Sequence, residues 1–123
     1  MLFKLIIVDG KEYKLRLGIK DTIALEKKIG TNPINKLIEM QNGQLPSMEF
    51  IKDVLQASLQ KFNKGMTEAK TEDLMDTMVD EGYDSEGFLN LMMEIMEVSG
   101  FFKKETLEAA EKEATAPEIT PAV

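Results

Sequence analysis

Carboxylates are the side chains most able to do chemistry in this sequence, and they crowd into one acidic stretch. Its members are Asp76, Asp80, Glu81, Asp84 and Glu86. A calcium-binding loop needs oxygen ligands at alternating positions, glycine at the sixth position and glutamate at the twelfth. If Gly87 is placed sixth, Gly82 becomes the first ligand and Met93 the twelfth, and neither supplies a carboxylate. The acidic stretch is therefore interpreted as a solvated helix face, and no metal site is predicted.

Few other side chains in this sequence could act in catalysis. The chain contains no cysteine and no histidine, so it lacks the commonest general base, the most reactive nucleophile and the ligands of soft metals. Paired carboxylates such as Asp80 and Asp84 could transfer protons, but nothing in the sequence buries them. We predict a protein that is not an enzyme, with no catalytic residue and no cofactor. Tight binding of magnesium or manganese would support the opposite view, an enzyme that uses carboxylates and a divalent metal.

Methionine points to binding rather than to catalysis. The chain has nine methionines, and five of them fall in two consecutive helical segments. Thioether side chains re-pack against differing apolar surfaces, so proteins that bind amphipathic helices use many of them. Core packing is the alternative role, and it is preferred for Met75, Met78, Met92 and Met96. For Met93, which lies off the main stripe of its helix, exposure to a partner is an equal alternative.

Two adjacent aromatic residues follow the last predicted helix. Phe101 and Phe102 cannot both face one core if the chain stays regular. Either Gly100 turns the chain so that both rings cap the core, or one ring contacts a partner or another subunit. The candidate partner-binding residues are Met92, Met93, Met96, Phe101 and Phe102.

The first 17 residues predict a β-hairpin, because two β-rich runs flank Asp9-Gly10, a strong turn signal. The apolar residues of both runs are mostly odd-numbered. A two-residue turn opposes odd with even positions, and would set Leu5 against Lys14. We therefore predict a longer, bulged turn with Gly10 left-handed, which keeps the apolar residues on one face. A pairing of Leu5 with Lys14 would contradict this prediction.

Helical segments follow, because the apolar period changes from two to 3.6. Their capping signals are Asp21, Asn32-Pro33, Ser47, Thr71 and Asp84 or Ser85. The predicted helices cover 22–29, 33–41, 46 to about 62, 71–82 and 86 to about 99. The fold class is therefore α+β and mostly α, with an N-terminal hairpin (1–17) packed on a bundle of about five helices (21–102).

Length and composition indicate one globular domain, residues 1–104, in a chain of 123 residues. From residue 105 the composition shifts to glutamate, alanine and lysine and then to proline-containing sequence, which predicts a flexible acidic tail over 105–123. The net charge of −7 argues against nucleic acid as a partner. The longest apolar runs are too short for a membrane span, and the N-terminal run is interpreted as a strand rather than a secretory signal.

Three segments, taken in order, carry a family resemblance over residues 1–104. They are the hairpin Val8-Asp9-Gly10-Lys11-Glu12-Tyr13, the run Leu25-Glu26-Lys27-Lys28-Ile29-Gly30-Thr31-Asn32-Pro33-Ile34, and, after a long helix, an acidic helix pair that ends Val98-Ser99-Gly100-Phe101-Phe102. This order resembles the tail assembly chaperones of long-tailed phages and prophages of Gram-positive bacteria. No single motif of that family defines a binding residue, so none is carried over.

The resemblance implies a non-catalytic protein that coats the tape-measure protein in the host cytoplasm before the tail tube forms around it. It leaves the tail tube protein and a second copy of the chain open as further partners. The expected mechanism is reversible burial of a partner helix against Met92, Met93, Met96 and Phe102. Partner binding that survives charged substitutions at Met93 and Phe102 would contradict it. The alternative is a small adaptor, such as a head–tail connector or an inhibitor of a host protein, which binds one folded partner.

Overall fold

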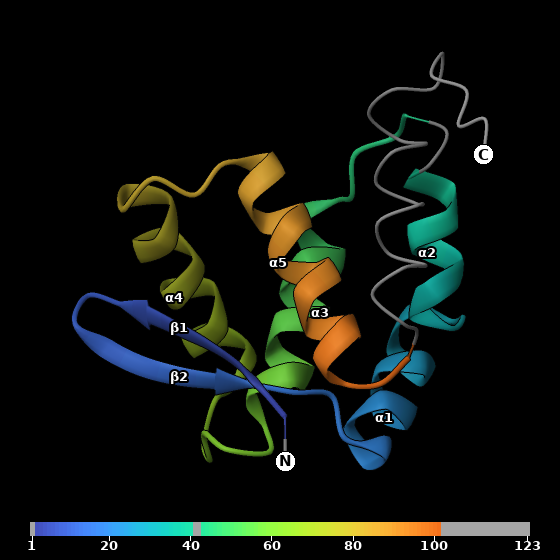
Figure 1. Ribbon diagram of the computed structural model, residues 1–123, viewed down its shortest axis with the longest axis horizontal. Coiled ribbons are helices and arrows are strands. Elements are labelled where there is room, and N and C mark those ends of the chain that lie inside the picture. The colour runs from blue at the N-terminus through green and yellow to red at the C-terminus, as the bar shows by residue number, and fades with distance from the viewer. Residues whose placement is uncertain (1, 41–42, 102–123) are drawn as a thin grey trace.

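The computed structural model describes residues 2–40 and 43–101 of the chain (Figure 1). Its elements are β1 (Lys4–Val8), β2 (Lys11–Leu15), α1 (Ile19–Ile29), α2 (Pro33–Met40), α3 (Met48–Leu59), α4 (Glu68–Asp80) and α5 (Ser85–Val98). The two strands form an antiparallel hairpin that packs on the helices. The predicted α+β, mostly helical architecture is confirmed. The tail predicted for 105–123 lies outside the described residues.

The hairpin turn is tighter than predicted. Leu5 pairs with Lys14 and Val8 pairs with Lys11, so only Asp9 and Gly10 connect the strands. Both turn residues have positive φ, 51° and 76°. This is the signature of a type I′ turn, in which Asp-Gly is a preferred pair and whose twist matches that of the flanking strands. The predicted bulged turn is therefore wrong.

This register places the apolar residues of β1 on both sides of the sheet. Ile6 and Val8 are buried together with Leu15 of β2. Leu5 and Ile7 point the other way and are 41% and 60% exposed. The parity argument failed because β1 is apolar at consecutive positions, so either set of residues could face the core. The strong local preference of Asp9-Gly10 for a two-residue turn decided the register.

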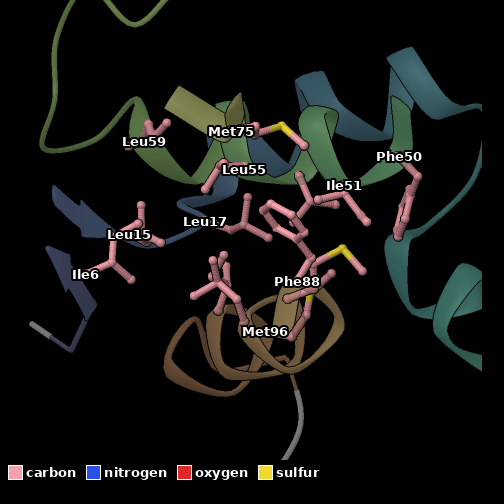
Figure 2. Packing of buried hydrophobic residues seen from close by; sticks show 14 of the residues in the cluster. Ile6, Leu15, Leu17, Phe50, Ile51, Leu55, Leu59, Met75, Phe88 and Met96 are labelled. Carbon is pink, nitrogen blue, oxygen red and sulfur yellow. The ribbon is translucent and has the colours of Figure 1, made fainter. Parts of the chain in front are cut away.

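The core lies between α3, α5 and the inner face of the hairpin. Figure 2 shows Ile51 and Leu55 of α3 pointing toward Phe88 and Met96 of α5, with Leu17 beside them. α3 is the central helix, because it contacts α1, α4, α5 and β2. Its position explains why eight of its twelve residues are buried.

Most helix starts follow the predicted caps. Ser47 accepts a hydrogen bond from the backbone N–H of Phe50, and Asp84 accepts one from that of Gly87. The prediction that Thr71 caps a helix is wrong, because α4 begins one turn earlier and is capped by Thr67. Thr71 is buried within α4, where its hydroxyl donates to the carbonyl of Thr67.

The differences at the other helix ends are smaller. α1 begins at Ile19 after Gly18, so Asp21 lies in the first turn and is not the cap. There its carboxylate interacts favourably with the positive, N-terminal end of the helix dipole. α3 ends at Leu59, before the expected position near Phe62.

The end of the hairpin is fastened to the end of α5. The Arg16 guanidinium donates to the carbonyls of Leu2 and Val98 at 2.9 and 2.7 Å. The backbone N–H of Leu17 donates to the Ser99 hydroxyl at 2.8 Å. Carbonyls in the last turn of a helix lack partners within the helix, so Arg16 satisfies one of them.

Candidate partner-binding groove

A groove of about 570 Å³ opens between α3, α4 and the start of α5. Its lining residues are Met48, Glu49, Lys52, Glu72, Met75, Asp76, Val79 and Phe88. Met75 and Phe88 are almost fully buried, whereas Met48 and Val79 are 50% and 53% exposed. The groove therefore offers apolar surface both at its floor and at its rim.

Helical spacing brings the α4 side chains into this groove. Glu72, Met75, Asp76 and Val79 are related by three, four and seven positions, the spacing of one helix face. Two carboxylates thus lie on the same stripe as two apolar side chains. The stripe therefore lines the groove with both polar and apolar side chains, the buried Met75 and the half-exposed Val79 among them.

The groove has a negative rim. Glu49, Glu72 and Asp76 are exposed, and none of them forms an ion pair within residues 2–40 and 43–101. Lys52 is the cation of the lining, but its side chain is buried and its ammonium pairs with Asp53 and Glu68. The unpaired charge that the groove presents to a ligand is therefore acidic.

The partners of Lys52 belong to an ionic cluster beside the groove, formed by Lys28, Lys52, Asp53 and Glu68. Asp53 Oδ1 lies 3.1 Å from the Lys28 ammonium and 3.3 Å from that of Lys52. Neither approach has hydrogen-bond geometry, so the buried oxygen is balanced by charge alone within the described residues. Lys52 also hydrogen-bonds to Glu68. The cluster joins α1, α3 and α4, and Lys52 is its one member in the lining of the groove.

Hydrogen bonding within the cluster shifts two pKa values. The bond to Glu68 raises the pKa of Lys52 above 10.5, although burial acts in the opposite direction. The same bond lowers the pKa of Glu68 below 4.5, helped by the charge of Lys28. Both residues are therefore ionised at neutral pH, and Lys52 is not available as a base.

The residues predicted to bind a partner lie elsewhere. Met92, Met93 and Met96 are buried at 2%, 6% and 0% exposure, and a partner could reach them only after the packing opens. Phe101 is half-buried and packs against the core after the chain turns at Gly100, which is compatible with both alternatives for the two aromatic rings. Phe102 lies outside the described residues. Partner binding through these five residues stays a prediction.

Sequence reasoning missed the groove for an identifiable reason. It assigned Asp76 to a solvated helix face and Met75 to the core, whereas the spacing of these two residues with Glu72 and Val79 places all four on one stripe. Plotting the segment at 3.6 residues per turn would have revealed this mixture. The contribution of Met48 could not be foreseen, because it depends on how α3 packs beside α4.

The acidic stretch 76–86 contributes to structure as well as to the groove. Asp84 caps α5, and the Glu81 carboxylate accepts a hydrogen bond from the backbone N–H of Asp9 at 2.8 Å. No group of three acidic side chains suited to a metal ion occurs in the described part of the chain. The helices described in 2–40 and 43–101 are all too short or too polar to cross a membrane.

The fold and the groove define a small, mostly helical α+β protein with an acidic-rimmed groove that is partly apolar. The chain belongs to DUF6096, a family of unknown function whose model matches residues 3–122. No curated protein and no solved structure matches the chain.

Proposed function

We propose that this protein is a non-catalytic chaperone of phage tail assembly that binds an amphipathic helical segment of the tape-measure protein. The observation that carries the proposal is the groove between α3, α4 and α5, where apolar side chains lie beside unpaired carboxylates. The resemblance in segment order supports the choice of partner. The proposal places the protein in the host cytoplasm, with the tail tube protein and a second copy as further partners.

Binding would follow from the chemistry of the groove. A partner helix with apolar residues along one face can bury them against Met48, Met75 and Val79. The flexible thioethers adapt to side chains of different shape, which suits a chaperone that meets many similar segments. Lysine or arginine at the edge of the partner helix would pair with Glu49, Glu72 and Asp76. A partner helix bound in the groove would be shielded from aggregation, and the net charge of −7 on this protein would favour solubility of the complex.

Co-expression with the tape-measure protein of the same genome tests this proposal. We expect the tape-measure protein to become soluble and to co-purify with this protein. The double variant Glu72→Lys/Asp76→Lys should weaken co-purification at least tenfold, because it reverses the charge of the rim. The matched control is Asp73→Lys/Asp80→Lys, which changes the net charge equally at exposed positions of α4 outside the groove. An insoluble tape-measure protein beside a folded, abundant chaperone, or equal loss in both variants, would overturn the proposal.

Burial of the methionine-rich α5 favours a second candidate function, an adaptor that binds one folded partner. With Met92 and Met96 in the core, the open apolar surface is a bounded groove rather than a broad face. An adaptor would form a complex of fixed, equal stoichiometry, whereas a chaperone would bind in many copies along a long partner. Light scattering of the purified complex distinguishes the two.

A further inference from the structure

The exposed side of α1 combines isoleucine and lysine side chains. We call this surface the α1 face and define it by Ile19, Lys20, Ile23 and Lys27. Ile19 is 73% exposed, more than any other large apolar side chain in the described residues, and Ile23 is 48% exposed. Lys20 and Lys27 are exposed as well, and within residues 2–40 and 43–101 neither forms an ion pair. The α1 face therefore places unpaired positive charge beside open apolar surface.

The two carboxylates of α1 lie at the margins of this face. Asp21 is half-buried and lines a pocket between α1 and α3. Glu26 is half-buried too, and it accepts a hydrogen bond from the Asn32 side chain at 3.2 Å. In the described part of the chain, neither carboxylate lies within ion-pair distance of the two lysines. The charge that the α1 face presents to a partner is therefore positive.

The α1 face points away from the groove of its own molecule. Lys28, on the side of α1 nearest α4, pairs with Asp53 at 3.1 Å and with Glu68 at 3.8 Å. Ile19 precedes Lys28 by nine positions, two and a half helical turns, so it lies on the opposite side of α1. Ile23 follows Ile19 by one turn and shares its side of the helix. One copy therefore cannot bury these isoleucines in its own groove.

The α1 face and the α3–α4–α5 groove are complementary in chemistry. The groove offers the half-exposed Met48 and Val79 beside the carboxylates of Glu49, Glu72 and Asp76, which form no ion pair within the described residues. The α1 face offers two isoleucines beside two unpaired lysines. A helix with an apolar stripe fits such a groove, and opposite charges at the edge favour its binding. A surface that complements a pocket elsewhere on the same molecule lets one copy dock on another.

We propose that the α1 face of a second copy closes the groove of the free protein, and that the partner helix displaces it. This inference rests on the proposed function of the groove and adds a competitor for it. Ile19 and Ile23 of one copy would pack on Met48 and Val79 of the next. The contact can be reciprocal in a pair of copies, or it can repeat from copy to copy. The net charge of −7 on each copy opposes association, which keeps the contact weak enough to be exchanged.

Sedimentation velocity of the full chain and of two charge-reversed variants tests the proposal. The α1 variant is Lys20→Glu/Lys27→Glu, and the groove variant is Glu72→Lys/Asp76→Lys. We expect the wild type to associate between micromolar and millimolar concentration. Each variant alone should associate about tenfold or more weakly, because its face and its groove then carry like charges. An equimolar mixture of the two variants should regain association, because every face then finds a groove of opposite charge.

The matched control is Asp73→Lys/Asp80→Lys, which has the net charge of the groove variant but leaves the groove lining intact. It should associate like the wild type. A wild type that stays monomeric over this range would overturn the proposal. So would equal loss of association in the control, or a mixture of the two variants that does not associate.

Co-purification with the tape-measure protein separates this inference from the function on which it rests. The α1 variant keeps the groove intact, so it should co-purify at least as well as the wild type, and bound tape-measure protein should break up the wild-type assembly. If the α1 variant loses the tape-measure protein as the groove variant does, α1 belongs to the partner site and the competition is refuted. If self-association follows the expected pattern while the tape-measure protein stays insoluble, the proposed function fails and closure of the groove by α1 stands.

Discussion

At the scale of single residues, Lys52 and Asp53 control how three helices meet. They are neighbours on α3, and both are buried, at 7% and 5% exposure. Their charged ends converge on one cluster, because Asp53 Oδ1 lies 3.3 Å from the Lys52 ammonium. Lys28 reaches the pair from α1 and Glu68 reaches it from α4. These pairs join the buried Lys52 and Asp53 to the half-exposed Lys28 and Glu68. We expect them to specify the helix arrangement more than they stabilise it, because removing charges from water costs about as much as their attraction returns.

The lowered pKa of Glu68 predicts how stability depends on pH. A carboxyl whose pKa is lower in the folded than in the unfolded state stabilises the fold above its unfolded pKa. This contribution is lost as the pH falls from about 4.5 through the folded pKa. We therefore expect the urea midpoint of the wild type to fall on acidification below this pH, and to fall less steeply in Glu68→Gln.

Urea unfolding between pH 7 and pH 3 measures this difference. Glu39→Gln is the matched control, because Glu39 forms a 3.8 Å pair with Lys36 on the surface and exposed pairs contribute little. The stability gap between wild type and Glu68→Gln should close as the pH falls. A gap that stays constant over this range would contradict the prediction.

At the scale of elements, the turn of the hairpin decides which side chains the molecule exposes. The two positive φ values of Asp9 and Gly10 select a two-residue connection. That connection puts Ile6 and Val8 into the core and leaves Leu5 and Ile7 outside. A turn longer by one residue would exchange these two sets, because side chains alternate along a strand.

Replacing Gly10 tests the energetic weight of this turn. We expect Gly10→Ala to lower the free energy of unfolding by about 1 kcal/mol, because an L-residue is disfavoured at positive φ. The cost is conformational, since an added Cβ would meet no atom within 4 Å. Gly18→Ala is the control, because Gly18 has a φ of −76° and should tolerate the change better. Equal effects of the two substitutions in urea unfolding would contradict the prediction.

The order and type of the elements could be predicted from the sequence, but not which side of each element faces the core. Helical periodicity and the caps at Ser47 and Asp84 depend on residues close together in the sequence, and tertiary packing leaves them unchanged. Thr67 and Thr71 are one turn apart, and either residue type can cap a helix. The sequence alone does not distinguish them; in the structure Thr67 caps α4 and Thr71 is buried inside it. The sides of β1 were likewise ambiguous, because both carry apolar residues.

The groove was beyond sequence reasoning for a related reason. The sequence marked Met92 and Met96 as candidates for binding because thioether side chains adapt to differing apolar surfaces. Both side chains are needed inside the molecule, since α5 packs against α3 and the hairpin. No pattern in the sequence indicates that Met48 and Val79 line a groove. They became neighbours only when α3 and α4 packed together.

At the scale of the whole molecule, α3 connects the hairpin to three other helices. We therefore expect the hairpin and these helices to unfold as one cooperative unit. Met96 of α5 is fully buried in the same cluster as Ile6 and Leu15 of the hairpin. A loss of packing at α5 should therefore also destabilise the hairpin.

Met96→Ala tests this cooperativity. We expect it to lower the free energy of unfolding by about 2–5 kcal/mol, since it opens a cavity in the core. Met96→Leu, which nearly conserves volume, should cost less than about 1.5 kcal/mol. Circular dichroism reports the helices, and the chain has no tryptophan, so tyrosine fluorescence reports Tyr13 of the hairpin and Tyr83. The two transitions should coincide in every variant, and separate midpoints would contradict a single unit.

The hydrogen bonds from Arg16 and Leu17 to Val98 and Ser99 also imply an order of events during synthesis of the chain. The two ends of the Leu17–Ser99 bond are 82 positions apart. At a synthesis rate of about 5–20 residues per second, roughly 4 to 16 seconds pass between their additions to the nascent chain. An isolated hairpin is marginal in water, so Ile6 and Leu15 remain uncovered during this interval. The protein therefore completes its core only when α5 is made, and a partner present during translation meets a more apolar surface than the finished molecule offers.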